Sequence, residues 1–199
     1  MTPATQTPPP RANAVNGVAT ITAARPSGPT VTAQPANSDR PLVRYLGAAI
    51  RLCLGWTFLW PFMDKTFGLG HETASADAWL SGGNPTEGFL SHSAGPFSGI
   101  YQGIAGAGVV NVLFMVGLLA IGTALLLGIA MWPACIAGAT MLILMWTASL
   151  PPENNLFMDD HIIYALVLIG LAAVGAGKTL GLGERWARTA VVQRYSWLA

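Results

Sequence analysis

Long apolar runs fill most of the chain between residues 40 and 177. Four of these runs have the lengths of membrane-crossing helices, at about residues 42–63, 109–131, 134–150 and 161–177. An α-helix rises about 1.5 Å per residue, so that roughly 20 residues cross a hydrocarbon layer of about 30 Å. The pattern therefore predicts an all-α integral membrane protein whose main domain, residues 40–177, is a four-transmembrane-helix bundle.

Two of these spans need a further argument. Only Trp132 and Pro133 separate the second run from the third, and proline is poorly accommodated in the middle of a helix, so we expect a tight helical hairpin there. The fourth run has only about 15 strongly apolar residues, 162–176, and by itself would also fit a buried core helix. The distribution of charge favours a crossing.

Positive residues gather before the first run and after the last: Arg40, Arg44, Lys178, Arg185, Arg188 and Arg194. The two connections on the other side, residues 65–108 and 151–160, carry mainly acids: Glu72, Asp77, Glu87, Glu153, Asp159 and Asp160. Lysine and arginine concentrate in cytoplasmic segments of membrane proteins. With four crossings, this asymmetry predicts that the N-terminus and the C-terminus are cytoplasmic and that both acidic connections are extracytoplasmic.

Composition agrees with a membrane protein and excludes some partners. Of the 199 residues, 52% are hydrophobic and 10% are charged, against about 25% charged in a typical soluble domain. A net charge of +1 offers no basic face for nucleic acid. Residues 1–39 contain half of the 14 prolines and no apolar run, which predicts a disordered cytoplasmic tail that is retained. Residues 178–199 are expected to form a cytoplasmic C-terminal segment.

The connection at residues 65–108 is rich in aromatic side chains that alternate with turn-forming residues. Aromatic residues are enriched where a membrane meets water. We expect this connection to form a folded extracytoplasmic cap between helices 1 and 2, with short helices at residues 75–80 and 98–104. A loosely ordered loop is the alternative interpretation.

Four side chains recur every seventh residue and share one stripe of the first helix: Arg44, Arg51, Phe58 and Lys65. Arg51 lies about 10 Å inside the span, where a charge normally faces the bundle interior, although a long side chain can also reach back to the interface. We expect the hydroxyl groups of Thr123 and Thr140 to accept its hydrogen bonds. Arg51 is also a candidate for the wall of a ligand pocket.

The segment before the fourth run carries the densest polar chemistry. Asp159 or Asp160 can cap the fourth helix, which would be a purely structural role. Alternatively, Asp160, His161 and Tyr164 lie within one turn of one another and form a proton-exchanging catalytic cluster. Lys65 ends the first helix on the same side, so we expect an ion pair between Lys65 and Asp159 or Asp160.

The sequence carries no signature of a bound metal, haem or flavin. Cys53 and Cys135 are not spaced as a metal or redox pair, and none of the three histidines lies deep in a span. The segment 175–179 only imitates the end of a phosphate-binding loop. If electrons pass through this protein, we expect a diffusible quinone or a partner's cofactor to take part.

Several segments, in this order, resemble the DoxX family, and more narrowly its DoxD-like branch. They are Arg51-Leu-Cys-Leu-Gly-Trp-Thr-Phe-Leu-Trp with Lys65, Trp79-Leu-Ser-Gly-Gly-Asn-Pro-Thr86, Gly95-Pro96, Leu113-Phe-Met-Val-Gly-Leu-Leu, Asn155 through Asp160-His161-Ile-Ile-Tyr164, and Gly-Leu-Gly183 with Trp186. The resemblance covers residues from about 40 to 190. It implies a four-helix protein of a bacterial plasma membrane.

DoxD-like proteins are membrane subunits of a thiosulfate:quinone oxidoreductase that work beside a smaller DoxA-like subunit. The resemblance thus implies a quinone-linked sulfur oxidoreductase, with these substrate- or quinone-binding residues: Arg51, Lys65, Trp56, Trp79, Asn155 and Asp159. Other DoxX members are associated with soluble partners such as a sulfurtransferase or a superoxide dismutase. The alternative function is therefore a non-catalytic membrane scaffold that docks a soluble redox-defence enzyme.

Overall fold

The computed structural model describes residues 40–153 and 155–198, and this part of the chain is helical without any strand. Three helices are long and apolar enough to cross a membrane: α1 (Pro41–Phe67), α4 (Gly108–Leu127) and α5 (Met131–Ala148). These are the helices of a multi-pass membrane protein, as the hydrophobic pattern predicts. The tail expected for residues 1–39 lies outside the described residues.

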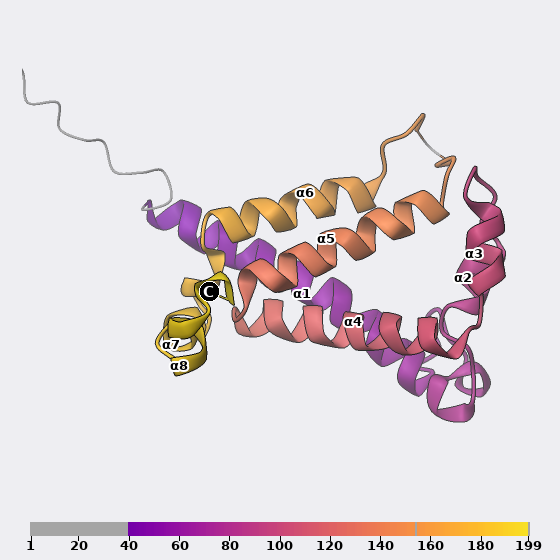
Figure 1. Ribbon diagram of the computed structural model, residues 1–199, viewed down its shortest axis with the longest axis horizontal. Coiled ribbons are helices and arrows are strands. Elements are labelled where there is room, and N and C mark those ends of the chain that lie inside the picture. Colours follow the sequence, from indigo (N-terminus) through magenta and orange to yellow (C-terminus); the bar gives the residue numbers. More distant parts are fainter. Residues whose placement is uncertain (1–39, 154, 199) are drawn as a thin grey trace, which may run out of the picture. The chain divides into compact units, whose positions relative to one another are not determined.

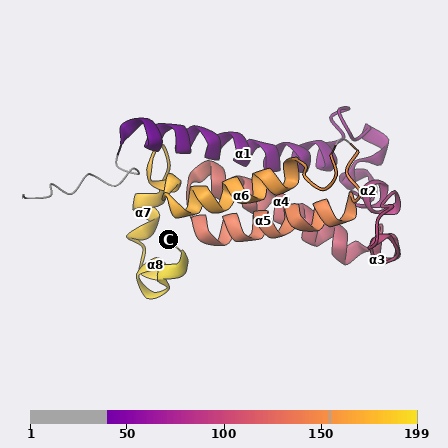
Figure 2. The same ribbon diagram turned by 90° about the horizontal axis from the view of Figure 1, so that it is seen from above.

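The long helices lie side by side with a fourth, shorter helix, α6 (Asp160–Ala173) (Figures 1 and 2). The closest pairs are α1 with α4 and α5 with α6, and α4 also packs on α5. Between them lies a core of aliphatic and sulfur-containing residues with one buried aromatic ring, that of Phe58: Leu54, Phe58, Met115, Leu118, Ile121, Leu125, Cys135, Leu142, Leu168 and Leu171. Most other large apolar side chains of these helices point outward, as expected for contact with lipid.

Helices α1 and α4 approach closely because glycines lie at their contact. A Cβ added to Gly122 would lie 2.9 Å from the backbone nitrogen of Leu59, and one added to Gly55 would lie 3.0 Å from the backbone nitrogen of Leu126. Small residues let helix backbones come together within a membrane. Glycines at this contact thus allow α1 and α4 to pack tightly.

The hairpin between α4 and α5 turns earlier than predicted. Its turn consists of residues 128–130, where Gly128 has φ 71° and Ala130 has φ 47°. Pro133 is the third residue of α5, where the missing N–H of proline costs no intrahelical hydrogen bond. The expected break at Trp132 and Pro133 is therefore wrong by a few residues, because a proline can begin a helix as well as interrupt one.

Helix α6 is shorter than the predicted span of 161–177. Its 14 residues would measure about 21 Å, less than the hydrocarbon thickness of a typical bilayer. It begins at Asp160 because the Asp159 carboxylate accepts a hydrogen bond from the Ile162 backbone N–H at 3.3 Å, which confirms the capping role. After its end the chain turns through Gly175, at φ 65°, into the short helix η4 (Ala176–Lys178).

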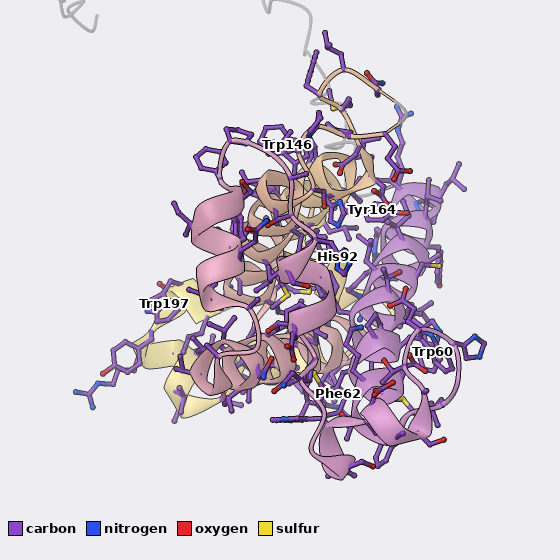
Figure 3. The ribbon with its side chains drawn as sticks, turned by 90° about the vertical axis from the view of Figure 1, so that its right-hand side faces the viewer. Trp60, Phe62, His92, Trp146, Tyr164 and Trp197 are labelled. Atoms are coloured by element: carbon purple, nitrogen blue, oxygen red, sulfur yellow. The ribbon has the colours of Figure 1, made fainter. Side chains whose placement is uncertain are left out.

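The connection between α1 and α4 is folded and lies at one end of the bundle (Figures 1 and 3). We call residues 68–107 the cap. It contains η2 (Ser75–Asp77), η3 (Trp79–Ser81), α2 (Glu87–Ser91) and α3 (Ser98–Ile104). The expected helix at 98–104 is confirmed, whereas the one at 75–80 is two short 3-10 turns and α2 was not predicted.

At the opposite end, three short helices follow η4: α7 (Gly183–Ala187), α8 (Ala190–Arg194) and η5 (Ser196–Leu198). They lie across the end of the bundle rather than along it (Figures 1 and 2). We call residues 176–198 the C-terminal collar.

The α1–α4 contact gives a prediction. Gly122→Ala places a methyl group against backbone atoms of α1, so we expect it to lower the free energy of unfolding by about 1–3 kcal/mol. Gly170→Ala on the exposed side of α6, where nothing lies within 4 Å, should be neutral or stabilising because alanine favours helix. Thermal unfolding in one detergent compares them. Equal midpoints for both variants would contradict the close contact.

Candidate functional site

Arg51 is fully buried, which confirms that it faces the bundle interior. Its Nη1 donates hydrogen bonds to the carbonyl oxygen of Leu125 and, at 2.9 Å, to that of Leu126. Its Nη2 donates to the carbonyl oxygens of Thr179 at 3.3 Å and Leu180 at 2.9 Å. One guanidinium group thus ties α1 to the last turn of α4 and to the C-terminal collar.

The carbonyl groups of Leu125 and Leu126 suit a cation because the last carbonyls of a helix lack intrahelical partners and carry the negative end of its dipole. The prediction that Thr123 and Thr140 satisfy Arg51 is wrong. Both threonines are exposed, and the Thr140 hydroxyl donates to the Ile136 carbonyl oxygen at 2.8 Å. Arg51 lines none of the cavities described below, so the geometry favours a role in stability over ligand binding.

An apolar cavity of about 710 Å³ opens between α4 and α5 at their cap end. Helices α2 and α3 contribute to its walls. Its main apolar lining residues are Phe89, Leu90, Ile104, Val110, Leu113, Phe114, Met141, Leu144 and Met145. Polar groups are few, and Lys65, Glu72, Thr86 and Tyr101 supply most of them. This combination of apolar walls and a few polar groups is typical of a small-molecule site.

A second, polar cavity of about 620 Å³ adjoins the apolar one, since Ala148 lines both. It lies between the end of α5, the start of α6 and the cap, at the end of the bundle that faces the viewer in Figure 3. Its polar and titratable lining consists of His92, Ser149, Glu153, Asn155, Asp159, Asp160 and His161. Four of the predicted site residues therefore line one cavity: Asn155, Asp159, Asp160 and His161.

His161 is held between two carboxylates. Its Nδ1 lies 2.9 Å from Asp159 Oδ2 and 3.5 Å from Asp160 Oδ1. Asp159 is the closer partner, because its other oxygen caps α6 and fixes the carboxylate in place. Tyr164, which the sequence groups with Asp160 and His161, is exposed and lines neither cavity. The geometry therefore favours an Asp159–His161 pair over the predicted trio, and the catalytic role of these residues stays a prediction.

The predicted ion pair between Lys65 and Asp159 or Asp160 is wrong. Lys65 Nζ lies 3.5 Å from Glu72 Oε2 instead. The cause is a turn after α1, in which the buried Asp64 carboxylate accepts hydrogen bonds from the backbone N–H groups of residues 71, 72 and 73 at 3.3, 3.1 and 3.0 Å. This turn folds Glu72 back onto the end of α1, where Lys65 meets it at the rim of the apolar cavity.

The two predicted tryptophans lie outside both cavities. Trp56 is 50% exposed on the outer side of α1, and its ring centroid is 5.8 Å from that of Trp60. Trp79 is partly buried and packs against the hydrophobic core. Their predicted part in quinone binding stays a prediction.

Sequence reasoning missed the hydrogen bonds that join the cap to the bundle. The Asn111 side-chain oxygen accepts from the Thr86 N–H at 3.1 Å and from the Thr86 hydroxyl at 2.6 Å, and its amide nitrogen donates to Asn84 at 3.1 Å. On the other side, the Tyr101 hydroxyl lies 2.5 Å from that of Thr147 in α5. The sequence offered one signal for the contact with Thr86: Asn111 is an amide residue near the start of an otherwise apolar run.

The cluster before α6 is also the place where a metal ion could be held. One ligand atom each from Asp159, Asp160 and His161 lies within 4.8 Å of the others. Two carboxylates and an imidazole would suit a divalent cation, but exposed acids gather in this way without one, and Asp160 is exposed. The expectation of no bound metal stays a prediction.

Comparisons with protein-family models, with curated proteins and with solved structures found no match. The likeness to the DoxX family therefore rests on the motifs described above.

The hydrogen bonds of Arg51 give a prediction. Arg51→Leu would leave four buried carbonyl groups without their charged donor, and each such bond contributes about 1.5–3 kcal/mol. We expect a loss of at least about 3 kcal/mol in the free energy of unfolding, and a smaller loss for Arg51→Lys, which keeps the charge without the fork.

Arg44→Leu is the matched control, since Arg44 is exposed and makes one side-chain hydrogen bond, at 3.3 Å to the Thr179 hydroxyl. Its expected loss is below about 1 kcal/mol. Denaturant unfolding in a single detergent measures all three. If Arg51→Leu were as stable as Arg44→Leu, the four hydrogen bonds would not contribute as described.

Proposed function

We propose that this protein is a DoxD-like membrane subunit of a quinone-linked sulfur oxidoreductase, and that the apolar cavity at the cap end binds the quinone. The observation that carries the proposal is the pairing of this cavity with a polar one that contains an acid–base pair. An apolar hydrogen carrier needs such a combination, because its ring and tail seek apolar surroundings while its reduction consumes protons.

The proposed topology has four crossings, with α6 as the fourth, both termini in the cytoplasm and the cap outside. Its support is the gathering of exposed cations at the collar end and of acids at the cap end. Because α6 is short, the bilayer would thin locally or the flanking turns would complete the crossing.

A labelling experiment tests this topology. A thiol reagent that cannot cross the membrane should modify Asp77→Cys in intact cells, because the cap would face outward. Ser196→Cys in the collar should react only after the cells are opened. The reverse pattern would overturn the orientation.

The apolar cavity has a suitable size and chemistry for a quinone ring. Its volume of about 710 Å³ lies within the usual range for small-ligand sites. Lys65 at the rim can donate a hydrogen bond to a quinone carbonyl oxygen, and the Tyr101 hydroxyl is a second candidate donor. The isoprenoid tail would leave between α4 and α5, along exposed side chains such as Leu113.

The polar cavity supports the proton half of the reaction. Reduction of a quinone to a quinol takes up two electrons and two protons. The His161 ring, oriented by Asp159, can pass protons from the aqueous side toward the apolar cavity. His92 and Glu153 line the same cavity and can extend this route.

Electrons must come from a donor. In the DoxD-type reaction, two thiosulfate ions join through a new S–S bond to form tetrathionate and release the two electrons that the quinone accepts. The polar cavity carries Glu153, Asp159 and Asp160 against two histidines, so its charge disfavours a thiosulfate dianion. We therefore place thiosulfate oxidation on a DoxA-like partner subunit.

The scaffold alternative has one observation in its favour. The connection before α6 presents an apolar tip in which Leu156 is 85% exposed and Phe157 is 57% exposed. Exposed apolar groups of this kind can dock a protein partner. On this interpretation the same partner would carry out all of the redox chemistry.

A filled cavity tests quinone binding. Leu113→Trp enlarges a side chain that lines the apolar cavity and is 68% exposed, so it should block the quinone without disturbing the core. Leu166→Trp is the control, because Leu166 is also 68% exposed but lines none of the described cavities. We expect the affinity for a short-tailed quinone, measured by calorimetry in nanodiscs, to fall at least about tenfold in the first variant only.

A turnover assay separates the two functions. With thiosulfate and a co-purified partner, His161→Gln should slow quinone reduction while leaving quinone affinity unchanged. If the native protein binds no quinone and the partner alone reduces it at the same rate, the scaffold function is correct and the proposed one is wrong.

A further inference from the structure

We propose that the end of the bundle opposite the cap holds an anionic phospholipid, with an acyl chain in a groove between α5 and the C-terminal collar and the headgroup against the arginines of the collar. This groove is a separate cavity from the proposed quinone site, although Ala137 of α5 lines both, and none of the roles described above accounts for it.

The groove has a volume of about 610 Å³. One wall is the outer side of α5 near its start, formed by Trp132, Pro133, Ile136 and Ala137, and the other wall is Ser196 with Trp197. Ile136 is 53% exposed and Trp197 is 63% exposed. The lining is therefore almost entirely apolar. The groove lies at the end of a helix that is long and apolar enough to cross a membrane.

The collar, which forms one wall of the groove, is basic. The described part of the collar has four exposed cations, Lys178, Arg185, Arg188 and Arg194, and a single acid, Glu184. Arg194 lies only two residues before the groove-lining Ser196. A phosphate diester suits arginine, whose planar group can donate two hydrogen bonds to it. An apolar slot with a basic segment as one of its walls matches the two parts of an anionic lipid.

The collar is fixed in place rather than loosely attached. The Leu182 N–H donates to the Leu127 carbonyl oxygen at 2.7 Å, and Trp186 Nε1 donates to the Leu198 carbonyl oxygen at 2.7 Å. Val192 is buried, and Arg51 binds the carbonyl group of Leu180 from inside the bundle. The groove is thus a preformed site, which lowers the entropic cost of binding.

The position of the groove favours a membrane lipid as its occupant. Its α5 wall is the exposed side of an apolar helix, where a bilayer supplies acyl chains, and Trp197 points away from the core of the bundle (Figure 3). Tryptophan and arginine are typical of the level at which headgroups meet hydrocarbon. A lipid of the surrounding membrane therefore fits the groove better than a soluble ligand would.

Native mass spectrometry of the full chain in mild detergent tests the proposal, with phosphatidylglycerol and phosphatidylcholine of the same acyl chains as probes. We expect the native protein to retain one phosphatidylglycerol preferentially. Each arginine near a headgroup contributes about fivefold in affinity, so Arg188→Gln with Arg194→Gln should weaken phosphatidylglycerol binding roughly 20- to 30-fold and leave phosphatidylcholine unchanged.

Two controls separate charge from the groove. Lys65→Gln removes one charge at the other end of the bundle and should leave the lipid preference intact. Trp197→Ala should weaken the binding of both lipids, because it removes one apolar wall. Equal retention of the two lipids by the native protein, or an unchanged preference in the double arginine variant with an unchanged melting temperature, would overturn the proposal.

Discussion

The guanidinium group of Arg51 makes the interaction on which the described structure most depends. A charge within a membrane helix is costly unless polar groups surround it, and here four backbone carbonyl groups do so. Two of them end α4 and two belong to the C-terminal collar, so that a single side chain joins three segments that are far apart in sequence. Glycines at 128, 177 and 181 surround this point, where a Cβ would meet Arg51 or a neighbouring backbone.

The two ends of the bundle are held together by different hydrogen bonds. At the collar end, hydrogen bonds draw α1, α4 and the collar together. At the cap end, α4 and α5 are bridged by cap residues, with Asn111 holding Thr86 on one side and Thr147 holding Tyr101 on the other. The apolar cavity lies between these two anchors. A cavity held open by these anchors at the cap end is consistent with the proposed binding of an apolar ligand there.

The sequence predicts those features that depend on helical periodicity. The expectation that Arg51 faces the interior is confirmed, and Phe58 on the same seven-residue stripe is buried too. Three of the four predicted spans are helices long and apolar enough to cross a membrane. It could not predict the partners of Arg51, because backbone carbonyl groups leave no trace in the residue pattern. It also misassigned Lys65, since the turn that brings Glu72 to it depends on hydrogen bonds from the backbone to Asp64. The sequence predicted part of the polar cavity, because Asp159, Asp160 and His161 are adjacent in the chain. It did not predict His92, which reaches the cavity from the cap.

Photolabelling tests the central claim, that the cap-end cavity binds a quinone, most directly. A short-tailed azidoquinone would be activated by light in nanodiscs that contain the full chain, and the modified peptides would be located by mass spectrometry. The account predicts labels on the cavity walls, around Leu113 in α4 and Met141 in α5, that disappear when unlabelled quinone is present in excess. Labels spread over the outer surfaces of the helices, and unaffected by unlabelled quinone, would contradict it.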